Sequence, residues 1–366
     1  MEVKKINFIY YVQKNLIESV KLPFISITLG LIVGGIIIAL SGGDSFAAIK
    51  GLIVGGFGSM HAITVTLTRA TPIIFAGLSA ALAWGSGYSS MGASGQMILG
   101  AFTAAITAVS ISGPSIVIII VSLSAGMLAG IIYSLIAAYI SAKFEVYLLI
   151  VTLMMNYIAD NIASYLTTYD FRDPLAVDRL AVQTQKIIDG TLPRIFPRYT
   201  LHYGFIIAIA CTLLVLFMMK RTSFGYEAKM SGLNPRFADY GGIDSLKTMY
   251  LVLMISGALA GLGGACESLG TRFRYVDGMI TSGGYAWSGI IASLMASNHP
   301  VGVFVSSVFL AGLTTGGGSI ELRHGIPSEI SDIIEGVLTM FVTAKLVVDF
   351  RFGRLRAQKE DGADVV

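Results

Sequence analysis

Apolar stretches of about 20 residues recur along this chain, and they constrain its fold more than any other feature. A helix of about 20 apolar residues spans the hydrocarbon core of a bilayer, and only helices and closed barrels cross that core without leaving unpaired backbone groups. The composition agrees, because 54% of the 366 residues are hydrophobic and only 13% are charged, against about 25% charged in an average soluble domain. We therefore predict an all-α polytopic membrane protein. The composition excludes an ordinary soluble enzyme and a disordered chain, and a net charge of +3 gives no indication of a nucleic-acid partner.

We expect about ten transmembrane or re-entrant helices. Two of them are short and flanked by glycine, which is typical of broken or re-entrant helices. The N-terminal run follows several lysines but has no convincing cleavage site, so we interpret it as a span that is retained. The stretch 45–58, which contains Lys50, is expected to be an interfacial helix. The predicted spans are 22–40, 62–83, 95–111 (short), 115–140, 146–168, 205–219, 249–269, 285–297 (short), 301–318 and 331–348.

The distribution of lysine and arginine predicts the orientation. With the N-terminus inside, the cytoplasmic segments carry fourteen of these residues and the external segments nine, and basic residues concentrate on the cytoplasmic side of membrane proteins. The predicted organisation is a cytoplasmic segment 1–21, a transmembrane domain 22–350 and a cytoplasmic tail 351–366. Within the domain we expect an external loop at 170–204 and a polar cytoplasmic segment at 222–243.

The segment 222–243 carries signals for helices. Ser223 is a suitable cap for a short helix, and Gly232 followed by Asn234-Pro235 is expected to end it. A second turn could start after Pro235. A short helix on the cytoplasmic face would suit docking of a soluble partner, although an ordinary connecting loop remains the alternative.

Few polar side chains fall within or near the spans, and burying charge in lipid is costly. Arg69, Asn156, Asp160 and Glu267 are the candidates. They either line a polar pathway for a solute or pair with neighbours in a structural role. Glycine pairs at four-residue spacing, such as Gly126/Gly130 and Gly257/Gly261, predict close helix packing.

Two other classes of function are alternatives for this sequence. Gly92-Ala93-Ser94-Gly95 and the later His299 match fragments of an intramembrane serine protease, but the serine and histidine are 205 residues and several spans apart. An ion-coupled secondary transporter is the other alternative. No cofactor or metal site is expected, and no phosphate-binding P-loop motif occurs. Any ATP-driven motor would therefore be a separate chain.

Six segments, in order, resemble the inner-membrane permease subunits of ABC importers, in the branch for simple sugars and nucleosides. Branched-chain amino acid permeases are more distant kin. The strings at Arg69–Pro72, Gly95-Gln96 and Asn156-Tyr157 resemble the nucleoside-type permeases that work with a basic-membrane-protein-like lipoprotein receptor. The six segments are 67–84, 91–101, 152–159, 222–243, 256–270 and 289–303.

The resemblance implies an importer of a small solute, most simply a nucleoside, with riboflavin or a simple sugar as alternatives in the same class. Ser94 stands where the family commonly has glutamate, and Leu148-Leu149 where it has Asn-Glu, which leaves the substrate open. The implied partners are an ATPase subunit, a second permease chain that is identical or paralogous, an extracytoplasmic substrate-binding lipoprotein and membrane lipid. The implied location is the bacterial cytoplasmic membrane, with both termini in the cytoplasm.

The resemblance also assigns roles to individual positions. One set would couple the chain to the ATPase, and the other would lie near the translocation path. The coupling set is Glu227, Ala228, Gly232, Asn234 and Pro235; the path set is Arg69, Gly92, Gly95, Gln96 and Asn156.

Overall fold

The computed structural model describes residues 45–174 and 182–324, together with residues 28, 32, 35, 36 and 336. The predicted spans 22–40 and 331–348, and both predicted terminal segments, fall outside this part of the chain or nearly so. In the described residues the fold is all-α. The helices are α2 (Ser45–Phe57), α3 (Met60–Gly85), α4 (Ala93–Ser110), α5 (Ser115–Phe144), α6 (Leu148–Tyr169), α7 (Gly204–Arg221), α8 (Ser223–Leu233), α9 (Pro235–Tyr240), α10 (Ser245–Glu267), the π-helix η1 (Ser268–Arg272), α11 (Met279–Ser282), α12 (Tyr285–Met295) and α13 (Pro300–His324).

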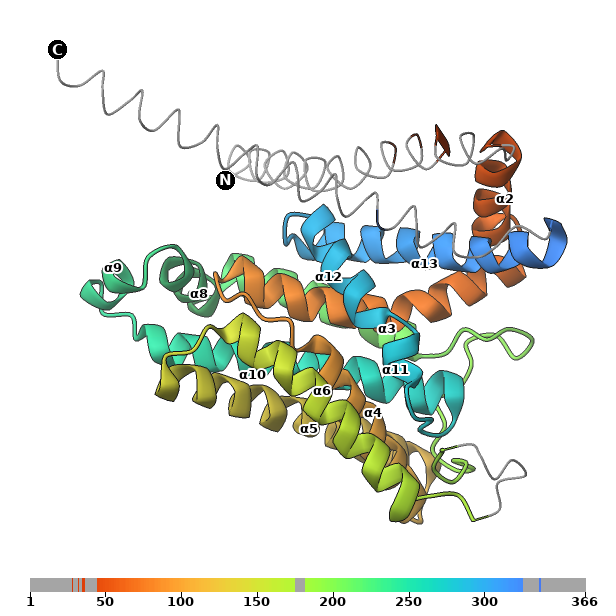
Figure 1. Ribbon diagram of the computed structural model, residues 1–366, viewed down its shortest axis with the longest axis horizontal. Coiled ribbons are helices and arrows are strands. Elements are labelled where there is room, and N and C mark those ends of the chain that lie inside the picture. The colour runs from red at the N-terminus through yellow and green to blue at the C-terminus, as the bar shows by residue number, and fades with distance from the viewer. Residues whose placement is uncertain are drawn as a thin grey trace, which may run out of the picture.

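Seven of the described helices are long and apolar enough to cross a membrane: α3, α4, α5, α6, α7, α10 with η1, and α13. They run roughly along one direction in the bundle (Figure 1). The segment 95–111 was predicted to be a broken or re-entrant helix; the break is wrong, because α4 continues unbroken for 18 residues. The short helix predicted at 285–297 is confirmed as α12, whose 11 residues rise about 16 Å, too little for a span of about 30 Å.

The helix predicted at 45–58 is present as α2, and it packs closely against the bundle. The hydroxyl of Thr66 in α3 donates to the carbonyl oxygen of Gly56 at 2.8 Å. Leu52 is buried beside α13, where its backbone contacts Gly316. The fold therefore joins α2 firmly to α3 and α13.

Glycine brings the central helices together. A Cβ added to Gly130 in α5 would overlap the carbonyl oxygen of Gly257 in α10 and lie 2.9 Å from the Cα of Gly261. These backbones touch because neither helix has a side chain there, so the predicted packing role of the Gly126/Gly130 and Gly257/Gly261 pairs is confirmed. Without a hydrophobic force between helices in lipid, such close approach supplies the van der Waals contact that holds the bundle together.

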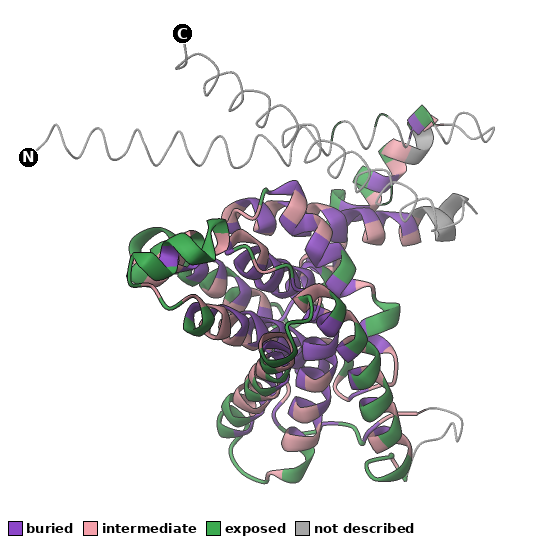
Figure 2. Ribbon diagram, turned by 60° about the vertical axis from the view of Figure 1, so that its left-hand side comes forward, coloured by how far each residue is buried: buried purple, intermediate pink, exposed green. Residues whose placement is uncertain are grey.

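Burial separates an inner helix from outer ones. In the most apolar stretch of α3, 83% of the residues are buried, whereas the corresponding share is 22% in both α5 and α7. Buried residues gather in the middle of the bundle, and exposed residues cover the outer helices (Figure 2). The outer faces of α5 and α7 thus stand where lipid would contact a membrane-embedded bundle.

The segment 182–203 lies along the chain that follows α10. Thr184 N–H donates to the Tyr275 carbonyl at 2.9 Å, and Leu192 N–H donates to the Leu269 carbonyl at 3.0 Å. Ile187 and Leu192 are buried in this contact. The segment is therefore a packed cap on one end of the bundle, opposite to the end that carries α8 and α9 (Figure 1).

Candidate functional site

The helices α8 and α9 occupy one end of the bundle, and the sequence around Asn234 determines where each begins and ends. The α8 cap is Thr222 and not Ser223, because the Thr222 hydroxyl oxygen accepts from Gly225 N–H at 3.4 Å. Asn234 ends α8 as predicted, and its Oδ1 accepts from Phe237 N–H at 3.1 Å, which caps α9. Pro235 takes the first position of α9, where its missing N–H costs nothing.

One face of α8 is fastened to the bundle. Ala228 is fully buried, and the Ser231 hydroxyl lies 2.7 Å from the Tyr88 hydroxyl, which also donates to the Ser245 carbonyl at 3.2 Å. A Cβ on Gly232 would overlap the Ser86 carbonyl oxygen. The helix therefore rests backbone against backbone on the turn that follows α3. Burial raises the pKa of Tyr88, so its phenol stays a neutral hydrogen-bond donor.

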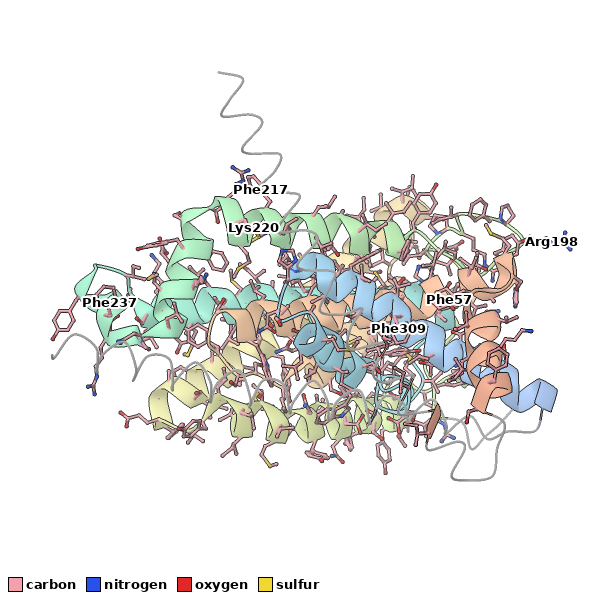
Figure 3. The ribbon with its side chains drawn as sticks, turned by 90° about the horizontal axis from the view of Figure 1, so that it is seen from above. Phe57, Arg198, Phe217, Lys220, Phe237 and Phe309 are labelled. Carbon is pink, nitrogen blue, oxygen red and sulfur yellow. The ribbon has the colours of Figure 1, made fainter. Side chains whose placement is uncertain are left out.

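The opposite face of this pair exposes large apolar side chains. The exposed fractions are 61% for Tyr226, 71% for Leu233, 67% for Phe237 and 93% for Tyr240. Phe237 extends from α9 at one end of the molecule, and Arg198 lies at the other end (Figure 3). We name Tyr226, Leu233, Phe237 and Tyr240 the terminal apolar face. These four exposed apolar side chains stand within a segment that is otherwise polar.

The predicted coupling residues divide between the two faces. Ala228 and Gly232 point toward the bundle, Glu227 is half-buried, and Asn234 and Pro235 are exposed. Sequence reasoning missed the terminal apolar face, although its aromatic and leucine residues stand out within a polar stretch.

The predicted path residues fall into two places. Gly92, Gly95, Gln96 and Asn156 lie together where α4 begins beside α6. Arg69 lies elsewhere. The start of α4 follows shortly after the end of α3, whereas Arg69 precedes that end by 16 residues, about 24 Å along the helix.

Asn156 joins α6 to the start of α4 with both ends of its amide. Its Oδ1 accepts from Gly95 N–H at 2.8 Å, and its Nδ2 donates to the Met91 carbonyl at 2.8 Å. The first N–H groups of a helix have no partner within the helix, so Asn156 satisfies one of them. Gln96 is 2% exposed, and its Oε1 has no hydrogen-bond partner in the described residues. The cluster thus contains one amide that is bonded at both its oxygen and its nitrogen and one unpaired buried side-chain carbonyl.

Glu267 and Asp160 lie closer to the other end of the bundle. The Glu267 carboxylate is 2% exposed, accepts from the Tyr285 hydroxyl at 3.2 Å and lies 3.7 Å from Arg272 Nε. Arg69 is close enough to interact with it electrostatically. Asp160 accepts from the Thr281 hydroxyl at 3.2 Å. Both carboxylates therefore have hydrogen-bond donors inside the protein.

A family model for the permease component of branched-chain amino acid transport systems matches residues 62–343. This chain belongs to that family. The seven helices that are long and apolar enough to cross a membrane agree with this membership. The permease resemblance inferred from sequence is confirmed, and the chain is a multi-pass membrane permease subunit of the ABC importer class.

Three relatives match almost the whole chain. The guanosine ABC transporter permease NupP of Bacillus subtilis is 31% identical over 91% of this chain and 96% of its own length. The nucleoside ABC transporter permease NupB of Lactococcus lactis is 27% identical over 95% and 97%. The glucose ABC transporter permease TsgB13 of Haloferax volcanii is 29% identical over 90% and 89%. No solved structure matches the chain.

Proposed function

We propose that this chain forms half of a translocation path for a nucleoside in an ATP-driven importer of a bacterial cytoplasmic membrane. Two relatives that align over nearly their full lengths are a guanosine permease and a nucleoside permease, which supports a nucleoside over the other solutes. The second permease chain and the substrate-binding lipoprotein belong to this proposal, with both chain termini on the cytoplasmic side. A simple sugar is the second candidate, favoured by the glucose permease relative.

The terminal apolar face carries the coupling part of the proposal. The ATPase is a separate subunit that docks on Tyr226, Leu233, Phe237 and Tyr240, while Ala228 and Gly232 hold α8 on the bundle. Exposed aromatic side chains are frequent anchors of protein interfaces. Because α8 is packed rigidly on the turn after α3 and on α10, movement of the ATPase would be passed to the helices that form the path.

A charge placed on the terminal apolar face tests this role. Phe237 is 67% exposed, so Phe237→Asp should leave the fold intact and remove the ATPase from the complex purified in mild detergent. The matched control is Ile188→Asp, an 85% exposed position in the segment at the opposite end of the bundle. Retention of the ATPase by Phe237→Asp would refute the docking role.

A further inference from the structure

The outer face of α6 differs from the outer faces of its neighbours. In the middle of α5 and α7 the exposed positions are aliphatic or phenylalanine, as at Ile132 and Phe217, and Tyr139, Lys143 and Lys220 are exposed only near the ends of these helices. On α6 the exposed residues include Tyr157, Asn161 and Tyr165. Asn161 is the fourteenth of the 22 residues of the helix, well away from both ends of this candidate span. An amide facing lipid tails there would be costly, so this face meets something other than lipid.

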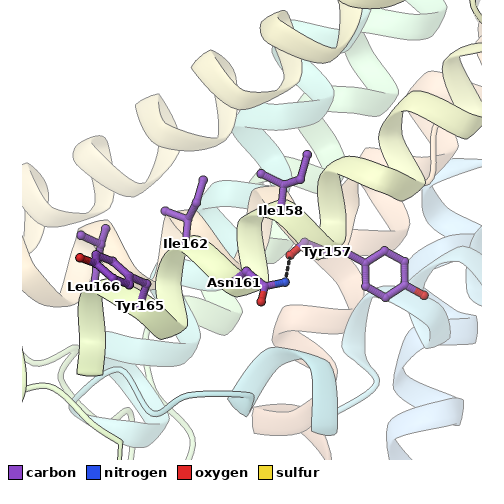
Figure 4. A pocket seen from close by; sticks show the side chains of 6 residues that line it. All are labelled: Tyr157, Ile158, Asn161, Ile162, Tyr165 and Leu166. Atoms are coloured by element: carbon purple, nitrogen blue, oxygen red, sulfur yellow. Dashed lines mark hydrogen bonds between the residues drawn. The ribbon is translucent and has the colours of Figure 1, made fainter. Parts of the chain in front are cut away.

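These residues line a shallow, open groove of about 410 Å³ along the surface of α6 alone. The lining consists of the two tyrosines, Asn161 and the aliphatic side chains of Ile158, Ile162 and Leu166 (Figure 4). Asn161 Nδ2 donates to the Tyr157 carbonyl at 2.7 Å, which fixes the amide in the groove. Its Oδ1 makes no hydrogen bond within the described part of the chain.

The three tyrosines and Asn161 follow a regular spacing. Positions 157, 161, 165 and 169 are four residues apart, so they lie on one side of the helix. The rings of Tyr165 and Tyr169 are 4.9 Å apart between centroids. The strip therefore runs from the middle of α6 toward the end of the bundle where the segment 182–203 packs.

Polar contacts accompany the strip at that end. The Ser164 hydroxyl donates to Asp277 Oδ2 at 3.1 Å, and the Thr281 hydroxyl donates to Asp160 Oδ1 at 3.2 Å. Both contacts join α6 to the chain that follows η1.

We propose that Tyr157, Asn161 and Tyr165 form a subsite for the purine base of the transported nucleoside, an inference that rests on the proposed function. Aromatic rings stack with the face of any base, and an amide pairs with the hydrogen-bonding edge of a purine. The aliphatic residues between the rings supply a flat apolar floor. A groove open on one side binds weakly, and weak binding at successive positions lets a solute enter and also leave.

Photolabelling of the complete transporter in liposomes tests the subsite. The probe is 8-azidoguanosine, supplied with the receptor and ATP, and the labelled peptides are identified by mass spectrometry. We expect label within residues 148–169. The double variant Tyr157→Leu/Tyr165→Leu should reduce this label and guanosine uptake about tenfold, whereas Tyr157→Phe/Tyr165→Phe keeps the rings and should retain both. The matched control is Phe217→Leu, an exposed aromatic position on α7, which should change neither.

The outcomes separate this inference from the function on which it rests. Normal guanosine uptake with label outside α6, or normal uptake by the Leu variant, would overturn the subsite and leave the nucleoside importer standing. Loss of the second permease chain from the purified Leu variant would overturn it as well, because the face would then be a contact between chains. Absence of guanosine uptake by the wild-type complex would refute the proposed substrate itself.

Discussion

Replacement of Gly232 by alanine should uncouple ATP hydrolysis from transport, because this glycine lets α8 rest directly on the turn after α3. An added Cβ would overlap the Ser86 carbonyl oxygen and lie 2.7 Å from the Gly87 nitrogen. Ordinary contacts between such atoms are about 3.5 Å or more, so α8 must move away by about 1 Å. The docking surface moves with it.

The energy of this change is small although the displacement is not. Forcing a methyl group into a filled contact costs about 1–3 kcal/mol, and alanine returns about 1 kcal/mol through its better helix propensity. The net loss of about 0–2 kcal/mol should leave insertion and ATPase association intact. We expect ATP-driven uptake in proteoliposomes to fall about tenfold, while ATP hydrolysis by the same complex falls much less.

Gly113→Ala is the matched control, since no atom lies within 4 Å of the Cβ it would add. It should transport at the wild-type rate. Uptake by Gly232→Ala that equals the control would refute the argument that a rigid contact at this glycine transmits the ATPase movement.

Two further substitutions test the packing of the bundle through thermal unfolding in detergent. Asn156→Leu leaves Gly95 N–H and the Met91 carbonyl unpaired, which should cost about 2–4 kcal/mol and lower the unfolding temperature; an unchanged temperature would contradict the joining role. Burial lowers the pKa of His202 from 6.5 to about 4, so the unfolded chain binds the proton first and stability should fall between about pH 6.5 and pH 4, by up to about 3 kcal/mol. Burial also lowers the pKa of His299 to about 4, so His202→Gln should remove its own contribution, about half of the total dependence of the two histidines. A slope identical to that of the wild type would show that His202 does not titrate on unfolding.

The sequence was sufficient to predict the seven helices of the described residues that are long and apolar enough to span a membrane, because apolar length alone specifies them. The end of α8 was also predictable, since Asn234-Pro235 cannot continue a helix but can begin one. The Thr222 cap was missed because two hydroxyl residues are adjacent, and only the backbone geometry decides which of them precedes the first helical turn. The continuity of α4 was missed because glycine at its start resembles a break, while Asn156 on another helix stabilises it.

The functional residues were predictable only in part. Periodicity within 222–243 does not reveal which side of α8 the bundle covers, so buried Ala228 and exposed Asn234 received the same role. The terminal apolar face depends on contacts with Ser86 and Tyr88, more than 130 residues earlier in the chain. The groove on α6 was likewise hidden, because its residues look like ordinary span residues until the neighbouring helices show which face remains uncovered.

The most direct test of the account is uptake of guanosine by the purified complex in liposomes, with ATP supplied on the side of the ATPase. The account predicts accumulation that requires both ATP and the ATPase subunit and that continues when an uncoupler removes ion gradients. It also predicts that Phe237→Asp abolishes accumulation. Accumulation that needs no ATPase and collapses with the uncoupler would contradict the central claim that this chain is driven through its terminal apolar face.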